Sequence, residues 1–289
     1  MTLVQASISN DGNTIVIIAD RLLTKSFGED FPSYEFESNS PKIISINNVG
    51  IGFAGSALYA DMATLDLQSN ISDKSNFEDI VDIISKFIKT TRESTIEDMV
   101  KKLSGISSED FFSNSEIVPE EVRSFIYGWL MEFRLEFECI LSGFDKNNKA
   151  EIVYITDDGS TFRATKFGVG SIGSGSLFSQ IYFDENNYNT SISEIESLFF
   201  AFKAKKWAQA PTGVGRKTDI ILLKKNGNKL EIRDEDDLMN EINNIYEEEK
   251  TKNNKIRNEL LNKLITNNSE RLKWNQAHCL QNGKKIKIN

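Results

Sequence analysis

Strand-like segments in this chain come in adjacent pairs separated by helix-like sequence, and this order constrains the fold more than any other feature. Alternating apolar and polar residues at 3–9 and a continuously apolar run at 14–19 flank the turn Asn10-Asp11-Gly12-Asn13. Period-two alternation and short apolar runs predict strands, and an Asp-Gly turn between them predicts a hairpin. A parallel doubly wound sheet instead needs strands and helices in strict alternation. Paired strands therefore predict two antiparallel sheets between helical layers, in the α+β class.

Further strand pairs are expected later in the chain, with helix-like sequence between them. The expected strands are 42–47, 49–54, 137–141, 151–155, 219–224 and 229–232. The expected helices begin after Gly55-Ser56 and continue at 77–88, 96–103, after Pro119, at 177–182 and at 192–207. Apolar residues at helical spacing predict the buried face of two of these helices. They are Leu58, Met62 and Leu65 in the first helix, and Val122, Phe125, Trp129 and Phe133 in the helix after Pro119.

The composition changes beyond Arg233, where the chain becomes acidic and rich in asparagine. We expect a domain over 1–232, with a helical insertion at about 106–135, and a C-terminal helical extension and tail over 233–289. Acidic residues at 247–249 interrupt the apolar stripe of this extension, which either packs on its own domain or docks partly on a neighbouring subunit. The stripe consists of Leu238, Ile242, Ile245, Ile256, Leu260 and Leu264.

Charge and composition exclude several classes of function. The sequence holds 34 Lys and Arg against 43 Asp and Glu, a net charge of −9. Such a charge repels nucleic-acid phosphates and anionic lipids, so we expect no nucleic acid and no membrane as partner. One histidine and two cysteines cannot build a structural zinc site, and we expect no metal and no cofactor. The N-terminus lacks the basic and apolar regions of a signal peptide, which predicts a cytoplasmic protein.

The scarcity of histidine also limits nucleophilic catalysis. A serine or cysteine nucleophile with a histidine base would have to use His278, close to the polar C-terminal tail. A threonine activated by its own N-terminal amine needs no histidine, because that amine has a pKa of about 8 and is partly neutral at cytoplasmic pH. Thr2 would be such a residue once Met1 is removed, which is usual before a residue as small as threonine.

Five segments that occur in one order make this interpretation more specific. They are Thr2-Leu-Val, then Asp11-Gly12 with Ala19-Asp20-Arg-Leu-Leu-Thr24, then Lys42-Ile with Gly52-Phe-Ala-Gly-Ser56, then Gly173-Ser-Gly-Ser176, and Gly215-Arg-Lys-Thr-Asp219. This set, over about 2–225, resembles the proteasome β subunits and their bacterial relatives, which are N-terminal-nucleophile (Ntn) hydrolases. The resemblance implies a four-layer αββα sandwich, a peptide or protein substrate, a homo-oligomer and a AAA+ unfoldase partner.

The resemblance also implies a role for five residues. Thr2 would be the nucleophile of a threonine-type peptidase, with its own amine as general base and an acyl-ester intermediate. Lys42 would favour ionisation of the Thr2 hydroxyl, and Asp20 would hold that lysine in place. Gly55 would donate its backbone N–H to the oxyanion. Ser174 would form a hydrogen bond with the terminal amine and help to pass protons.

Two further residues would bind substrate. Thr24 would pair with the substrate backbone as an added strand, and Phe53 would lie near the floor of the first side-chain pocket, leaving it shallow. Leu22 departs from the family pattern, which commonly has an arginine two residues after the aspartate. Because Leu22 is only two residues from Asp20, this departure affects the geometry that the resemblance implies around Asp20.

Three alternatives remain open at the level of sequence. The chain could be a proteasome-like ring scaffold or interaction protein without catalytic activity. It could also be a peptide ligase or transpeptidase that uses the same threonine, because hydrolase and ligase share every catalytic residue. The segment 168–173 matches the dinucleotide-binding pattern GxGxxG, but it lies late in the chain and does not open a βαβ unit.

Overall fold

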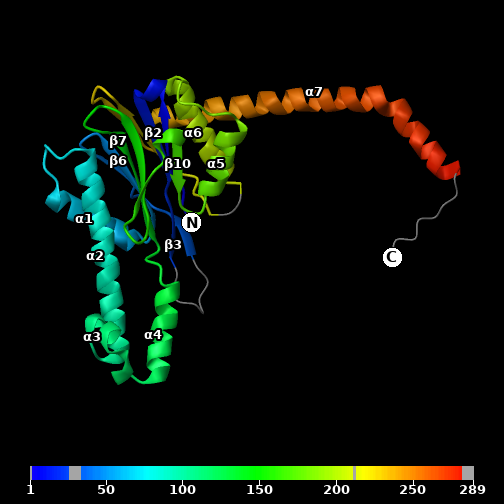
Figure 1. The fold of residues 1–289 in the computed structure, drawn as a ribbon. Helices are drawn as coiled ribbons and strands as arrows, with labels where there is room; N and C mark the ends of the chain where they lie inside the picture. Colours follow the sequence, from blue (N-terminus) through cyan, green and yellow to red (C-terminus); the bar gives the residue numbers. More distant parts are fainter. Residues whose placement is uncertain (1, 26–33, 211–212, 282–289) are drawn as a thin grey trace. The chain divides into compact units, whose positions relative to one another are not determined.

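The computed structural model describes residues 2–25, 34–210 and 213–281. It has a mixed α and β fold with a helical C-terminal part (Figure 1). The chain divides into two compact units, 1–236 and 237–289. Each unit is described below by itself.

The strands of the first unit form two five-stranded antiparallel sheets, as the paired segments predict. The first sheet has the order β10 (Val169–Ile172), β1 (Val4–Ser9), β2 (Thr14–Asp20), β11 (Thr218–Lys224) and β12 (Lys229–Ile232). The second has the order β5 (Ile43–Ile46), β6 (Val49–Gly55), β7 (Phe137–Phe144), β8 (Ala150–Ile155) and β9 (Thr161–Arg163). All the strand pairs of both sheets are antiparallel, so neighbouring strands need only short connections or returning helices.

The two sheets share one hydrophobic core. Val4, Ala6 and Ile8 of β1 belong to the same buried cluster as Ile140 of β7 and Ile152 of β8. The alternate residues of β1 face the helices: the Gln5 side chain donates to the Ala201 carbonyl at 2.6 Å, and the Ser7 and Ser197 hydroxyls lie 3.3 Å apart. The polar residues Gln5 and Ser7 of the period-two pattern are therefore buried against α6 (Glu194–Ala208) and hydrogen-bonded there.

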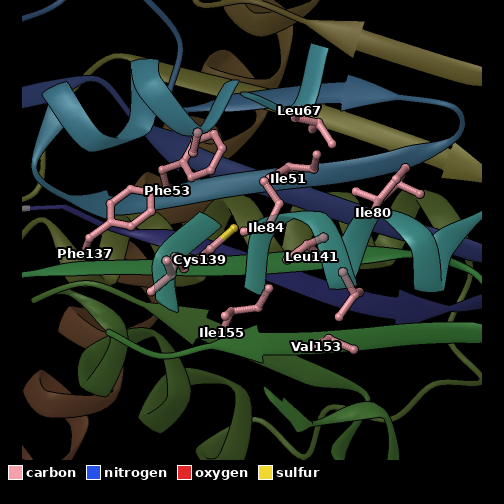
Figure 2. Packing of buried hydrophobic residues seen from close by; sticks show 14 of the residues in the cluster. Ile51, Phe53, Leu67, Ile80, Ile84, Phe137, Cys139, Leu141, Val153 and Ile155 are labelled. Atoms are coloured by element: carbon pink, nitrogen blue, oxygen red, sulfur yellow. The ribbon is translucent and has the colours of Figure 1, made fainter. Parts of the chain in front are cut away.

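A second core lies between the second sheet and two helices, α1 (Ala57–Asn70) and α2 (Phe77–Ser104). Figure 2 shows Ile51, Phe53, Leu141 and Val153 of the sheet beside Leu67 of α1 and Ile80 and Ile84 of α2. On the first sheet, α5 (Ser176–Glu185) contacts β10, and α6 contacts β1 and β2. In Figure 1 these two helix pairs lie at opposite sides of the strands.

The predicted buried face of α1 is wrong. Leu58, Met62 and Leu65 are 65%, 42% and 62% exposed, whereas Ala63 and Leu67 are buried. Small residues allow the helix backbone to approach the sheet closely, and the turn before α1 decides which side faces inward. The spacing of apolar residues in the sequence reveals neither how closely the helix approaches the sheet nor which side the turn directs inward.

The segment between β6 and β7 differs from the expectation in two ways. Residues 96–103 continue α2, which is one helix of 28 residues capped by an Asn76 and Asp79 capping box. Phe125 of α4 (Glu120–Glu132) is 59% exposed, and Ile126 occupies the core instead. A small separate cluster joins α3 (Ser108–Ser113) and α4 to the end of α2, and it contains Val100, Phe111, Val118 and Ile126.

The second unit is one helix, α7 (Asp237–Gln281), of 45 residues. The helix runs through the acids at 247–249, which interrupt only its apolar stripe. Their i,i+3 and i,i+4 partners Lys250 and Lys252 form ion pairs with Glu247 and Glu248, which supports the helical conformation. None of the helices within the described ranges is long and apolar enough to cross a membrane.

Candidate active site

Thr2 and Lys42, 40 residues apart in the sequence, meet at one end of the two sheets. Thr2 lies two residues before the first residue of β1 in the first sheet, and Lys42 directly precedes β5 of the second sheet. The Lys42 Nζ lies 2.9 Å from the Thr2 Oγ1. It also contacts the two Asp20 carboxylate oxygens at 3.1 and 3.2 Å and donates to the Leu22 carbonyl at 2.5 Å. The lysine therefore links a hydroxyl, a carboxylate and a main-chain oxygen.

Asp20, at the end of β2, is completely buried and surrounded by donors. Its Oδ1 accepts from the Leu3 N–H at 2.8 Å, and its Oδ2 accepts from the Leu22 and Gly215 N–H groups, each at 2.9 Å. Together with Lys42, these donors compensate the burial of the carboxylate. Its position is therefore determined by three separate backbone segments.

Two opposing effects act on the pKa of Lys42. Burial lowers this pKa from the usual 10.5, and the Asp20 charge and hydrogen bond raise it. Burial is the larger of the two effects, so the ammonium loses its proton more readily than that of an exposed lysine. The Asp20 carboxylate favours the cationic form of this lysine next to the Thr2 hydroxyl.

The glycine-rich turn at 173–175 holds Thr2 from the other side. The Thr2 nitrogen donates to the Ser174 Oγ at 3.1 Å, and the Gly175 N–H donates to the Thr2 carbonyl at 3.1 Å. Gly173 has a φ of +84°, and a Cβ there would lie 2.4 Å from the Thr2 carbonyl oxygen. Only glycine tolerates both this φ and this close approach.

Gly55 ends β6 in a conformation that only glycine adopts easily. Its φ is +101°, and a Cβ would lie 1.9 Å from the Glu136 carbonyl oxygen. The turn places its backbone next to Thr2, since both residues line the same two cavities. Gly55 therefore borders the same space as Thr2.

We expect Gly55→Ala to distort this turn. A side chain at a positive φ costs about 1 to 3 kcal/mol, and the clash with the Glu136 carbonyl adds to that cost. The melting temperature and the rate at which a peptide electrophile modifies Thr2 should both decrease. Gly105→Ala is the matched control, because Gly105 has a φ of +77° but no neighbour within 4 Å of a Cβ. An equal effect of the two variants on modification would contradict a special role for the Gly55 turn.

Two cavities open next to Thr2. The larger, of about 760 Å³, also contacts Ser174 and is bordered by Glu136 and Glu138. The smaller, of about 200 Å³, extends to Lys42 and Phe53. Phe53 is buried and stacks on Phe137 with ring centroids 5.7 Å apart, so this part of the smaller cavity is rigid and aromatic.

The segment that contains Thr24 forms a hairpin that the sequence did not predict. Its strands are β3 (Leu22–Lys25) and β4 (Tyr34–Glu37), and they are short, without the apolar run that indicates a strand. Thr24 pairs with Glu35 in the backbone register, and its side chain lies outside the described residues. Leu22 and Leu23 of the same hairpin line the larger cavity.

The sequence did not reveal three contacts of the site. Leu22 contributes its main-chain carbonyl and N–H, so an arginine is not needed at this position for either bond. Arg21 pairs with Asp219 and Glu235, and these bonds raise its pKa above that of a usual arginine. Gly215 lies in a segment that carries the resemblance, but no pattern linked its N–H to Asp20.

No group of three or more His, Cys, Asp and Glu side chains in the described part of the chain could hold a metal ion. Burial raises the pKa of the Cys139 thiol well above its usual value, so this cysteine in the second core is not a reactive thiolate.

Comparisons with known proteins give a match at the level of structure. No model of a protein family matches the sequence, and no curated protein does. The Gly-1 mutant of Anbu from Hyphomicrobium sp. strain MC1 is 12% identical with a TM-score of 0.56, covering 87% of this chain and 96% of its own. Anbu from Yersinia bercovieri, described as an ancestral β-subunit, is 10% identical with a TM-score of 0.56, covering 86% and 95%. At these identities the likeness shows that the chain has a proteasome-like fold.

Proposed function

We propose that this protein is an N-terminal threonine peptidase that attacks amide bonds through an ester on Thr2. The contact that carries the proposal is the 2.9 Å distance between the Lys42 Nζ and the Thr2 Oγ1, in a cavity large enough for a peptide. A lysine placed on a threonine hydroxyl, and itself anchored by a buried aspartate, favours an alkoxide. If Lys42 and Asp20 formed only a structural ion pair, the lysine would not need to contact the Thr2 hydroxyl.

The proposed reaction begins with removal of Met1, which converts the peptide nitrogen of Thr2 into a primary amine. That amine takes the proton of the Thr2 hydroxyl while Oγ1 forms a bond to the substrate carbonyl carbon. The Gly55 N–H stabilises the resulting oxyanion, a contribution of about 3 kcal/mol in other acyl transfers. The C–N bond then breaks, the leaving amine receives the proton from the Thr2 ammonium, and an acyl ester remains.

A water molecule completes the proposed cycle. The Thr2 amine takes a proton from the water as its oxygen attacks the ester carbon. The ester C–O bond then breaks, and Oγ1 regains its proton. The Ser174 Oγ, 3.1 Å from the Thr2 nitrogen, is placed to orient this amine in both halves of the reaction.

The proposal includes the four-layer αββα order of Ntn hydrolases. It is supported by the core that the two sheets share and by the helices α1 and α2 on one sheet and α5 and α6 on the other. In such an arrangement the two chain segments before β1 and β5 come together at one sheet end, which is where Thr2 and Lys42 meet.

We expect the rate of Thr2 acylation to follow a bell-shaped pH profile. The rate should rise as the Thr2 amine, with a pKa of about 8, loses its proton and becomes a base. It should fall again as Lys42 becomes neutral, at a pH below 10.5, because burial lowers the pKa of this lysine. Single-turnover rates across this range provide the measurement. A rate that stays constant through pH 10.5 would contradict the role of the Lys42 charge.

The direct test of the function starts with the mass of the purified chain, which should lack Met1. The chain is then incubated with a peptide epoxyketone, and we expect a single adduct that peptide mapping places on Thr2. Peptide amide substrates separate the chemistries: products that gain water identify a peptidase, and products that gain an added amine identify a ligase. A processed chain that forms neither adduct nor product would be a scaffold and would overturn the proposal.

A further inference from the structure

Lys205 is a buried lysine that the proposed reaction does not use. It lies in α6 with an exposed fraction of 0%. Its Nζ donates to the carbonyls of Gly215, Arg216 and Lys217 at 2.7, 2.9 and 3.1 Å, and to the Thr218 Oγ1 at 2.8 Å. Three successive carbonyls thus converge on one ammonium group.

The acceptors around Lys205 select its charged form. The Thr218 hydroxyl directs its own proton to the Arg216 carbonyl at 3.2 Å, so it faces Lys205 as an acceptor. Burial, followed by the neighbouring Lys206, lowers the pKa of Lys205 to about 7, whereas the charge of Asp20 acts in the opposite direction. A neutral amine offers only two protons to these four acceptors, and the ammonium offers three.

The N–H groups of the same segment point at carboxylates. The Gly215 N–H donates to the Asp20 Oδ2 at 2.9 Å, and the Arg216 N–H donates to the Glu37 Oε1 at 2.5 Å. The peptide groups of 215–217 therefore lie between a cation on their carbonyl side and two anions on their N–H side. In the peptide group that joins Gly215 and Arg216, the Lys205 contact with the carbonyl polarises the N–H that donates to Glu37 and strengthens that hydrogen bond.

We propose that Lys205 is a positioning residue of the Thr2 site, acting through the Gly215 N–H on Asp20. Its ammonium holds the 215–217 segment so that this N–H meets the Asp20 Oδ2, and Asp20 in turn holds Lys42 on the Thr2 Oγ1. The relay has four links, and each is a hydrogen bond between described residues.

If residue 205 served only to stabilise the fold, it would not need to be a lysine. Burial of a cation costs several kcal/mol before its partners compensate it, and an apolar side chain of similar volume is often at least as stabilising. The neutral Gln209 side chain already donates to the Gly215 carbonyl at 2.6 Å, so this carbonyl has another partner. The specific contribution of Lys205 is a positive charge that orients three carbonyls at once.

The inference rests on the proposed function for its kinetic test, which uses the full chain. Lys205→Met keeps the side-chain volume and removes the charge, and we expect epoxyketone modification of Thr2 to slow by about 10- to 100-fold with unchanged inhibitor affinity. Lys203→Met is the matched control on α6, where Lys203 lies over the Phe199 ring at 4.9 Å from its centroid, and it should react like the wild type. Lys205→Ala should be slow and should recover with ethylammonium, but not with tetramethylammonium, which has no N–H.

A folded Lys205→Met variant that reacts at the wild-type rate overturns the proposal, and so does Lys205→Ala that fails to recover with ethylammonium. If Lys205→Met does not fold, Lys205→Gln keeps hydrogen-bond donors without the charge, and a wild-type rate in that variant overturns the proposal. Crystal structures of the wild type and Lys205→Met separate this inference from the proposed function, because they need no reaction. Loss of the Gly215 to Asp20 hydrogen bond in the variant supports the inference even for an inactive chain, and an unmoved Asp20 overturns it.

Discussion

Replacing Thr2 by alanine is expected to abolish covalent modification by a peptide epoxyketone and all peptide turnover. Removal of the nucleophile in another peptidase costs about a million-fold in rate, and no other hydroxyl among the described residues both contacts a lysine ammonium and lies on the residue that loss of Met1 makes N-terminal. The Thr2 Oγ1 accepts from Lys42, and the Thr2 nitrogen donates to Ser174. Intact mass measures both removal of Met1 and formation of the adduct.

Thr2→Ser is the matched control for this variant. It keeps a hydroxyl at the same position, and Met1 is removed before serine and alanine as it is before threonine. The serine variant should form the adduct, and the alanine variant should not. Both variants should have the same melting temperature, because the Thr2 side chain belongs to none of the hydrophobic clusters described above. Modification of the alanine variant at the wild-type rate would place the reaction at another residue.

The second large effect is expected from Lys42→Met, which should lower the acylation rate by about 100- to 1,000-fold, the typical cost of one electrostatic group next to a developing charge. The substitution also leaves the Asp20 carboxylate buried without its cation, and breaking a buried pair costs about 3 to 5 kcal/mol. We therefore expect a lower melting temperature as well. The acylation rate and the melting temperature are measured on the same preparation.

Two controls separate the lost charge from the lost stability. Lys149→Met removes an exposed lysine that pairs with Glu151 and should change neither rate nor stability appreciably. Lys42→Arg keeps a cation near Asp20 while changing its geometry, so it should recover more stability than activity. A folded Lys42→Met variant that reacts at the wild-type rate would refute the role of the lysine in ionising Thr2.

Much of the strand pattern and the residues that meet at Thr2 could be predicted from the sequence. Strands β1 and β2 have strong alternation and a continuous apolar run, and these local signals survive in the fold because both faces of each strand become buried. Thr2, Asp20, Lys42 and Ser174 were selected by their order in five motifs, and the structure brings them within hydrogen-bond distance of one another. Their roles in catalysis remain the proposal made above.

Several features could not be predicted, for distinct physical reasons. The strands of the β3–β4 hairpin have only four residues each, which is too short for hydrophobic periodicity to mark them clearly. The face that α1 buries depends on the turn at Gly55 and Ser56, and this is why Leu58 and Leu65 are exposed.

The sequence by itself determined which segments become strands and which side chains could take part in threonine chemistry, because both depend on residue type and spacing. Only the tertiary structure decided how these side chains are held. The Gly215 N–H on Asp20, the Leu22 carbonyl on Lys42 and the three carbonyls on Lys205 are main-chain contacts between segments as many as 195 residues apart. Every residue except proline has the same N–H and C=O groups, so residue type carries no information about such contacts, and only the path of the folded backbone creates them.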